Sequence, residues 1–202
     1  MKWRLSCLLL LLIGLLSGGA AAAAEQPQQV IRQFCDTLLD VMKQGSRLGY
    51  GGRSDELRPA VLKAYDMSVM TRSAIGPEAA KLSAAQLQQL DDAFTQYTVA
   101  NYAEQFDGWS GERCEVDAAR PSTGGSVVVP SRIVPKTGEP TEIDYLMRQD
   151  AGGEWKIIDV LLDGTISQVA VRRSEFVSIL RRDGPTGLLH QLASKTAALA
   201  SK

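Results

Sequence analysis

The chain has 202 residues, of which 45% are hydrophobic, and its formal net charge is −1. That length and apolar content suffice for one domain with a sizeable core. The absence of a basic excess argues against nucleic acid as the main partner.

The first 24 residues have the pattern of a cleavable secretory signal peptide. Lys2 and Arg4 form a basic start, an apolar stretch of about 12 residues follows, and small residues lead to Ala24. A membrane span needs about 20 apolar residues, so the stretch predicts cleavage near Ala24 rather than an anchor. We therefore expect export to the periplasm and a single mature domain over residues 25–202. Loss of the two basic residues leaves 20 basic against 23 acidic side chains, a formal charge of −3.

The mature chain retains two cysteines, Cys35 and Cys114. An oxidising compartment allows them to pair, and closing a loop of 79 residues would stabilise the fold by about 4 kcal/mol in the chain-entropy model. Cys35 also lies in a helical pattern, where it would serve equally as a small buried hydrophobe. The spacing leaves both interpretations open.

Helical patterns dominate the first half of the mature chain. Apolar residues recur at helical spacing from Pro27 to Gln44, and a short helix is expected after the glycine-rich turn at residues 49–52. Ser83 and Gln86 then have the spacing of a capping box. The box opens the longest predicted helix, which runs to about Phe106.

Strand patterns follow. Pro130 and Pro135 bracket an expected edge strand or bulge, next to the β-branched run Val127–Val129. Polar and apolar residues alternate over Thr141–Arg148, and a glycine hairpin turn leads into a second strand, Trp155–Leu162.

The C-terminal region is helical again, and Asp183-Gly184-Pro185 divides it into two predicted helices. The order is therefore helices, an antiparallel meander, and helices. It predicts a single α+β domain in which the helices pack on one face of an antiparallel sheet.

Catalytic and metal-binding motifs are absent from the sequence. The only histidine is His190, and there is no nucleophile elbow, no Cys-x-x-Cys, no His-Glu-x-x-His, no phosphate-binding loop and no calcium loop. We therefore expect no catalytic residues, no cofactor and no metal, and we predict that the chain is not an enzyme.

Three stretches, taken together, resemble a known family. They are Asp66–Met70 with Gly76 and then Gln86, Phe94 and Tyr102; Trp155–Val160 leading into Asp163–Ser167; and Arg172–Phe176, Ile179–Gly184 and Gly187-Leu188. Because of the order and spacing of these stretches, the chain resembles the toluene-tolerance or MlaC family of periplasmic lipid carriers. The resemblance extends from about Pro27 to Leu192. Tyr145–Arg148 and Asp163–Ser167 are most similar to its hopanoid-associated HpnM branch.

The resemblance implies an α+β fold with an apolar cavity enclosed between sheet and helices. It implies a lipid-binding shuttle that carries phospholipid or hopanoid-type lipid between membranes for an Mla-type ABC transport system, the kind of system associated with outer membrane lipid asymmetry. The implied partners are the lipid, an inner-membrane ABC transporter complex and an outer-membrane lipoprotein complex. No cofactor is implied.

The positions expected to line the cavity follow from faces and spacing. Strand alternation puts Ile143, Tyr145 and Met147 on the side opposite the charged residues, and the long helix can set aromatic side chains against them. The cavity candidates are Phe94, Tyr97, Phe106, Ile143, Tyr145 and Met147. The same positions also suit an ordinary packed core, in which case the chain would be a periplasmic adaptor without lipid cargo.

Four arginines on the C-terminal helices are candidates for a basic docking patch: Arg172, Arg173, Arg181 and Arg182. Such a patch would contact acidic partner proteins or anionic head groups. The alternative is an ordinary solvated helix face.

Overall fold

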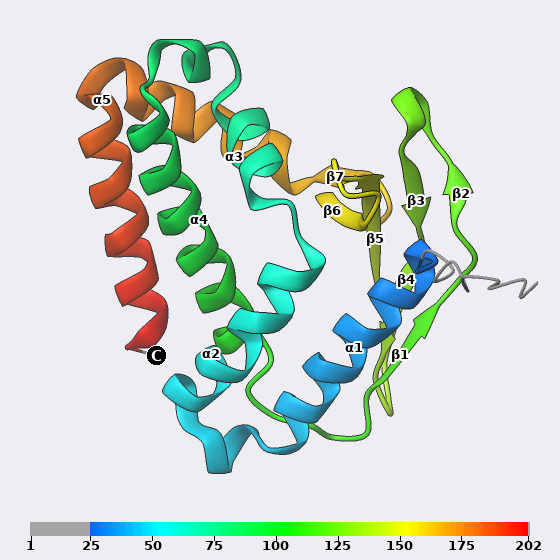
Figure 1. The fold of residues 1–202 in the computed structure, drawn as a ribbon. Helices are drawn as coiled ribbons and strands as arrows, with labels where there is room; N and C mark the ends of the chain where they lie inside the picture. The colour runs from blue at the N-terminus through cyan, green and yellow to red at the C-terminus, as the bar shows by residue number, and fades with distance from the viewer. Residues whose placement is uncertain (1–24, 202) are drawn as a thin grey trace, which may run out of the picture.

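The structure, a computed structural model, describes residues 25–201, and the predicted signal peptide lies outside them (Figure 1). The helices are α1 (Pro27–Lys43), α2 (Gly45–Ala64), α3 (Met67–Ile75), the 3₁₀ helix η1 (Gly76–Lys81), α4 (Ala84–Gln105) and α5 (Gln168–Ala200). The strands are β1 (Arg113–Val116), β2 (Arg120–Pro121), β3 (Val127–Val129), β4 (Ser131–Val134), β5 (Thr141–Gln149), β6 (Trp155–Leu162) and β7 (Ile166–Ser167), with the short 3₁₀ helix η2 (Thr123–Gly125) before β3.

Side-chain caps fix where the central helices begin. The capping box is confirmed: Ser83 Oγ accepts a hydrogen bond from the Gln86 amide at 3.2 Å, and Gln86 Oε1 accepts one from the Ser83 amide at 2.9 Å. Asp66 caps α3 in the same way, accepting from the Val69 amide at 2.9 Å. These caps set the starts of α3 and α4.

Two helices bend sharply at glycines whose backbone is left-handed. Gly49 in α2 has φ 61° and Gly184 in α5 has φ 67°, a conformation that only glycine adopts at little cost. The short helix predicted after residues 49–52 is the second limb of α2, and the predicted division at Gly184 is confirmed. Figure 1 shows the first limb of α5 crossing behind α3 and the start of α4, and the second limb descending beside α4.

The sheet is antiparallel and is built around β5. One edge of β5 pairs with β4 at Thr141 and Glu142 and then with β3 at residues 145–147. The other edge pairs with β6 from Ile143 to Gln149, with an irregularity between Leu146 and Met147. β1 and β2 extend the first side beyond β4 and β3, and β7 extends the second side beyond β6.

The predicted edge strand between Pro130 and Pro135 is not at an edge. It is β4, which lies between β1 and β5. Pro130 instead marks the break at which the chain passes from β3 to β4 along one edge of β5. The outer strands on this side, β1 and β2, were not predicted, because four residues and two residues are too short to show a clear hydrophobic period.

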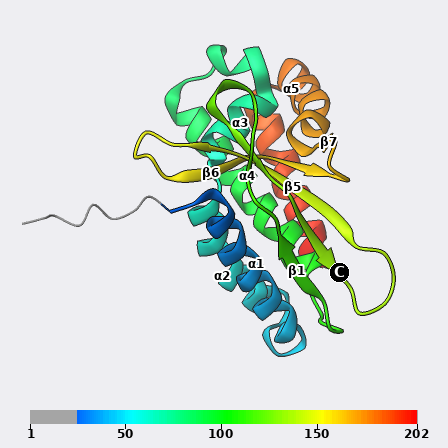
Figure 2. The same ribbon diagram turned by 90° about the vertical axis from the view of Figure 1, so that its right-hand side faces the viewer.

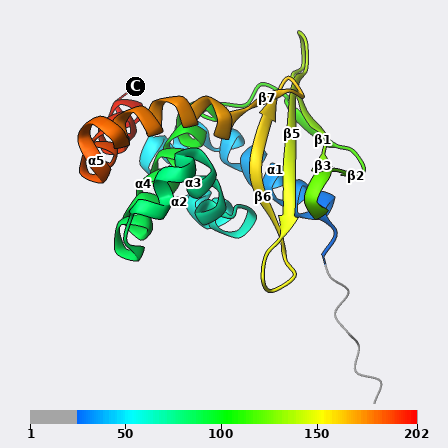
Figure 3. The ribbon, with the colours of Figure 1, turned by 90° about the horizontal axis from the view of Figure 1, so that it is seen from above.

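The helices lie on one side of the sheet, as Figures 2 and 3 show, so the predicted α+β fold class is confirmed. One hydrophobic core joins the two layers. Ile31 of α1, Leu57 of α2, Leu90 of α4 and Ile157 of β6 are fully buried in it. Within residues 25–201, none of the helices has the length and apolar character of a membrane span.

A disulfide fastens the first helix to the outermost strand. Cys35 of α1 and Cys114 of β1 are bonded, with an S–S distance of 2.02 Å and a Cα–Cα distance of 6.0 Å. Cys35 is also buried in the core, so both roles left open by the sequence are present together. The bond closes a loop that contains α2, α3 and α4.

Candidate functional site

A pocket of about 160 Å³ lies between α4, the ends of β5 and β6, and the start of α5. Its lining residues come from helices and strands far apart in the sequence. They are Tyr65, Met70, Phe94, Tyr97, Thr98, Asn101, Tyr102, Gln105, Phe106, Ile143, Val160, Leu162, Gln168 and Arg172. The pocket therefore exists only because the long helix stands beside the sheet.

The walls of the pocket are mainly apolar. Phe94 comes from α4 and Phe106 from the position directly after its end, and Ile143 and Leu162 line the pocket from β5 and β6, where they are cross-strand partners. Residues three and four apart on a helix share a face, so α4 can line the pocket with successive turns. Such a lining favours hydrocarbon over polar ligands.

The rim is polar and carries a cation. The guanidinium of Arg172 lies over the ring of Tyr97, 5.1 Å from its centroid, and both residues line the pocket together with Gln168. A cation held on an aromatic face in this way is partly fixed in position. Arg172 is half-buried, so its charge is available both to the pocket and to solvent.

The first turn of α5, directly before Arg172, is held to the sheet by Asp159 of β6. One carboxylate oxygen of Asp159 accepts from the Val169 amide at 3.1 Å, and the other accepts from Ser167 Oγ at 2.5 Å. Ser167 in turn caps the helix by accepting from the Ala170 amide at 2.9 Å. These bonds place the start of α5 at the pocket rim.

Two tyrosine hydroxyls meet at the inner end of the pocket, and a third tyrosine, Tyr145, is buried in the core beside them. The hydroxyls of Tyr65 and Tyr102 are hydrogen-bonded to each other, 2.5 Å apart. Burial raises the pKa of all three phenols, well above the usual value for Tyr65 and Tyr145, so each stays neutral. Phe34 packs edge-on against the three rings, with centroids 5.2 to 6.4 Å away.

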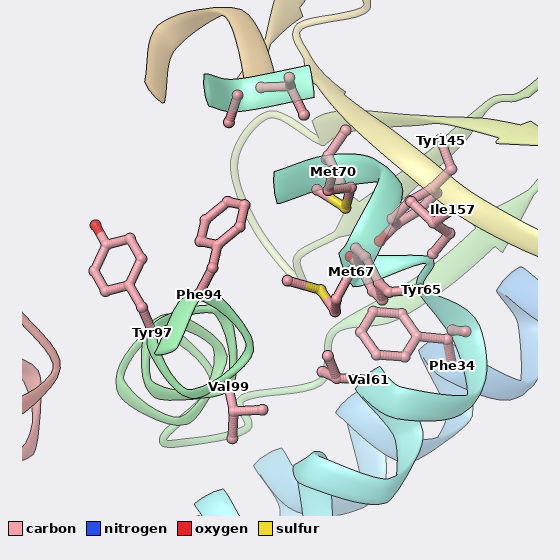
Figure 4. Close-up of a cluster of buried hydrophobic side chains, with 14 of the residues drawn as sticks. Phe34, Val61, Tyr65, Met67, Met70, Phe94, Tyr97, Val99, Tyr145 and Ile157 are labelled. Carbon is pink, nitrogen blue, oxygen red and sulfur yellow. The ribbon is translucent and has the colours of Figure 1, made fainter. Parts of the chain in front are cut away.

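Four of the six predicted cavity residues line this pocket: Phe94, Tyr97, Phe106 and Ile143. Tyr145 and Met147 share the inner face of β5 with Ile143, as the alternation predicted, but they are not part of the pocket lining. Both are fully buried in the core. Figure 4 shows Tyr145 beside Phe34 and Tyr65, and Phe94 and Tyr97 on α4 across from them. Tyr145 and Met147 therefore lie in the packed core next to the pocket, and their place in a lipid cavity stays a prediction.

The four arginines predicted to form a docking patch do not share a helix face. Arg172 and Arg181 are nine residues apart, as are Arg173 and Arg182, and nine residues make about two and a half turns. The members of each pair consequently leave α5 on opposite sides. Arg172 alone among the four lines the pocket.

Two of these arginines are also engaged with neighbouring acids. Arg181 Nε lies 2.9 Å from Glu78 Oε1, and Arg182 Nη2 lies 2.7 Å from Asp183 Oδ2. Helical geometry therefore separates the four charges, and local ion pairs engage two of them, so a docking role for these arginines stays a prediction.

Residues 25–201 contain no group of three or more metal-ligand side chains. A buried carboxylate does occur at Asp91, whose pKa is raised because burial disfavours its charged form. Asp91 does not line the pocket. The pocket thus combines apolar walls, one cation and neutral hydroxyls, a set suited to holding a ligand.

Comparison with known proteins shows the family. The profile of the MlaC protein family matches residues 32–194 of the chain. The chain belongs to the MlaC family. No curated protein matches it in sequence.

The fold of this MlaC-family chain is similar to that of the phospholipid-binding protein from Ralstonia solanacearum, whose structure was determined in complex with a phospholipid. The TM-score is 0.75 at 22% sequence identity, and the match covers 87% of this chain and 99% of that chain. The similarity shows a common fold over nearly the whole domain.

Sequence reasoning missed three important pocket residues of this MlaC-family chain: Tyr65, Tyr102 and Arg172. Tyr102 lies on the predicted long helix, one turn beyond Thr98, so helical spacing could have placed it beside the other lining residues. Tyr65 follows the end of α2 and Arg172 was expected on the surface. No local pattern indicates that these two meet α4 at one pocket.

Proposed function

We propose that this chain is a periplasmic lipid-binding shuttle, which carries phospholipid between membranes for an Mla-type ABC transport system. The observation that carries the proposal is the apolar pocket with Arg172 at its rim, in a chain of the MlaC family. The pocket walls suit acyl chains, and the guanidinium suits a phosphate. The phospholipid bound by the protein with the similar fold supports the same ligand class.

The energetics of lipid transfer explain why a carrier needs such a pocket. Exposing an acyl chain to water costs about 0.8 kcal/mol per methylene, so a chain of about 16 carbons loses roughly 12 kcal/mol. Only an apolar enclosure of comparable length offsets that cost. Phe94, Phe106, Ile143 and Leu162 provide the beginning of such an enclosure.

A complete lipid requires more space than the pocket now provides. A volume of about 160 Å³ is close to that of an engineered cavity that binds benzene, and sites for drug-sized ligands are roughly 300–1,000 Å³. Loading therefore requires α4 and the first limb of α5 to move away from β5 and β6. The half-exposed residues at the rim, among them Gln168 and Arg172, are where this opening would begin.

The proposal extends to compartment, partners and cargo. Export depends on the signal peptide predicted for residues 1–24, and exchange would involve an inner-membrane ABC transporter complex and an outer-membrane lipoprotein complex. The similarity of Tyr145–Arg148 and Asp163–Ser167 to the HpnM branch makes a hopanoid-type lipid the alternative cargo.

Lipid extraction from the purified mature protein tests the proposal directly. We expect mass spectrometry to find about one equivalent of copurifying phospholipid, and we expect the lipid-free protein to take labelled phospholipid from one population of vesicles and deliver it to another. A hopanoid in the extract would change the cargo assignment. Protein that contains no lipid and transfers none would instead be an adaptor with a packed core.

Arg172 should set the affinity for anionic lipids. Replacing it with Gln removes the cation at the rim, and a charge-assisted hydrogen bond to phosphate contributes about 1.5–3 kcal/mol. We expect Arg172→Gln to weaken binding of phosphatidylglycerol by roughly tenfold or more, measured by equilibrium competition in low salt. Arg182→Gln removes the same charge from the exposed side of α5 and should change binding by less than about twofold. Equal effects of the two variants would show that only net charge matters.

A further inference from the structure

Exposed apolar side chains gather at the point where β7 leads into α5. Within residues 25–201 four large hydrophobic side chains are exposed, and two of them, Ile166 of β7 and Val171 of α5, are each 48% exposed. Figure 3 shows β7 running directly into the first limb of α5. The other two, Leu62 and Trp109, are not part of the pocket lining. Single exposed hydrophobic residues are ordinary, whereas those that gather in one place mark an interaction surface.

The start of α5 sets Ile166 and Val171 side by side. Ser167 is the N-cap residue, and its side chain accepts a hydrogen bond from the Ala170 amide at 2.9 Å. Ile166 therefore precedes the cap and Val171 is the fourth residue of the helix. Apolar residues at these two positions pack against each other as a hydrophobic staple. The staple covers one side of each side chain, and about half of each is still open to solvent. We call this pair the mouth patch.

The mouth patch continues the apolar wall of the pocket outward. Ile143 pairs with Leu162, and Leu162 pairs with Ile166, so the three side chains form one row on the same face of β5, β6 and β7. Neighbouring strands are about 4.8 Å apart, so the row spans about 10 Å from the pocket to the surface. Val171 lies three residues after Gln168, a lining residue, and is therefore its neighbour on the surface of α5. Hydrocarbon that leaves the pocket along this row meets the mouth patch first.

We propose that Ile166 and Val171 are a membrane contact, which enters the boundary of the bilayer hydrocarbon while a lipid passes between the bilayer and the pocket. The inference rests on the proposed lipid-binding function and names the surface with which the pocket mouth docks. Burial of the mouth patch in the bilayer would keep the acyl chain out of water during the passage. The contact therefore governs how fast lipid enters, rather than how tightly the pocket holds it.

The size and charge of the surroundings favour a bilayer as the occupant. Two half-exposed aliphatic side chains are a small surface beside the roughly 800 Å² that each partner buries in a specific protein complex. Arg172 at the rim and Asp163, exposed in the turn before β7, bring charges of both signs close to the patch. A zwitterionic phospholipid presents an ammonium and a phosphate, which complement both. Apolar side chains with a polar surround are the arrangement by which proteins bind in the plane of a membrane interface.

The rate of lipid uptake tests the contact. Lipid-free protein is mixed with phosphatidylcholine vesicles that contain a fluorescent phosphatidylglycerol and a quencher that stays in the vesicle, and the rise in fluorescence follows transfer to the protein. We expect Ile166→Ser and Val171→Ser each to slow uptake about fivefold, because about half of each side chain remains to be buried. The amount bound at equilibrium should match that of the wild type, and the slower rate should persist in high salt.

Leu62→Ser is the matched control. Leu62 is 54% exposed on α2 and does not line the pocket, so the variant removes an equally exposed aliphatic side chain from another part of the surface. We expect it to change the rate of uptake by less than about twofold.

A labelled thiol tests the contact without any transfer of lipid. Cys35 and Cys114 are bonded to each other, so Ile166→Cys gives the mature chain a single free thiol, which can carry an environment-sensitive fluorophore. We expect its emission to shift to the blue when phosphatidylcholine vesicles are added. The same fluorophore on Leu62→Cys should not shift.

The outcomes separate this inference from the proposed function. Uptake at the wild-type rate in both serine variants, or emission from position 166 that vesicles leave unchanged, would overturn the membrane contact while lipid binding stands. Equal shifts at positions 166 and 62 would mean unspecific adsorption and would overturn it too. A wild-type protein that takes up no lipid would overturn the proposed function and the inference with it. The thiol measurement decides the matter even if the serine variants do not fold.

Discussion

Reduction of the Cys35–Cys114 disulfide is expected to lower the melting temperature of the mature protein by about 10 °C. The two cysteines are 79 residues apart, and a cross-link of that span stabilises by about 4 kcal/mol in the chain-entropy model. For a domain of this size each kcal/mol corresponds to about 2–4 °C. The physical reason is that the bond limits the unfolded chain, in which α1 and β1 would otherwise separate freely.

The measurement is thermal unfolding followed by circular dichroism, with and without a reductant, together with a thiol count to establish that reduction is complete. A double variant, Cys35→Ala with Cys114→Ala, should melt at a lower temperature and should not respond to the reductant. If full reduction leaves the wild-type melting temperature unchanged, the native packing rather than the cross-link holds β1 against α1.

Local chemistry explains which parts of the fold could be predicted from the sequence. The capping box at Ser83 and Gln86 involves residues three apart, and the bend at Gly184 depends on one residue and its proline neighbour, so both are readable without the tertiary structure. The alternation of Ile143, Tyr145 and Met147 likewise follows from the strand period alone. Each of these predictions was confirmed.

The division of that inner face between pocket and core could not be predicted in this way. Tyr145 meets Phe34, a residue more than one hundred positions earlier in the chain, with ring centroids 6.4 Å apart. Ile143, two residues before Tyr145, instead faces the pocket beside α4. Whether protein packs over Ile143 or over Tyr145 depends on where α1 and α4 lie against the sheet. The alternation of side chains along β5 does not determine the positions of those helices.

The role of Arg172 was missed for a similar reason. Helical periodicity treats an arginine next to exposed residues as solvated. Its place at the pocket rim depends on Asp159, which binds the first turn of α5 through Ser167 and the Val169 amide. That contact joins a strand to a helix and appears only in the assembled fold.

Ile143→Trp and Met147→Trp should therefore have opposite effects, although the two residues share one face of β5. Ile143 lines the pocket, so an indole there should occupy space intended for lipid. We expect copurifying lipid to fall at least tenfold, which corresponds to about 1.4 kcal/mol or more, while the melting temperature of the lipid-free protein changes by less than about 2 °C. Met147 is fully buried, and overpacking of a filled core costs typically 1–3 kcal/mol.

For Met147→Trp this cost predicts a fall of about 5 °C in the lipid-free melting temperature, with lipid retained at temperatures where the variant is folded. The two variants, Ile143→Trp and Met147→Trp, serve as controls for each other, because both introduce the same side chain on the same face of β5. Lipid extraction and thermal unfolding of the two variants decide between the two assignments. Loss of lipid without loss of stability in Met147→Trp would mean that the acyl chain extends past Ile143 into the region now occupied by core. A large loss of stability in Ile143→Trp would mean that the pocket is packing space that no ligand enters, as an adaptor with a packed core requires.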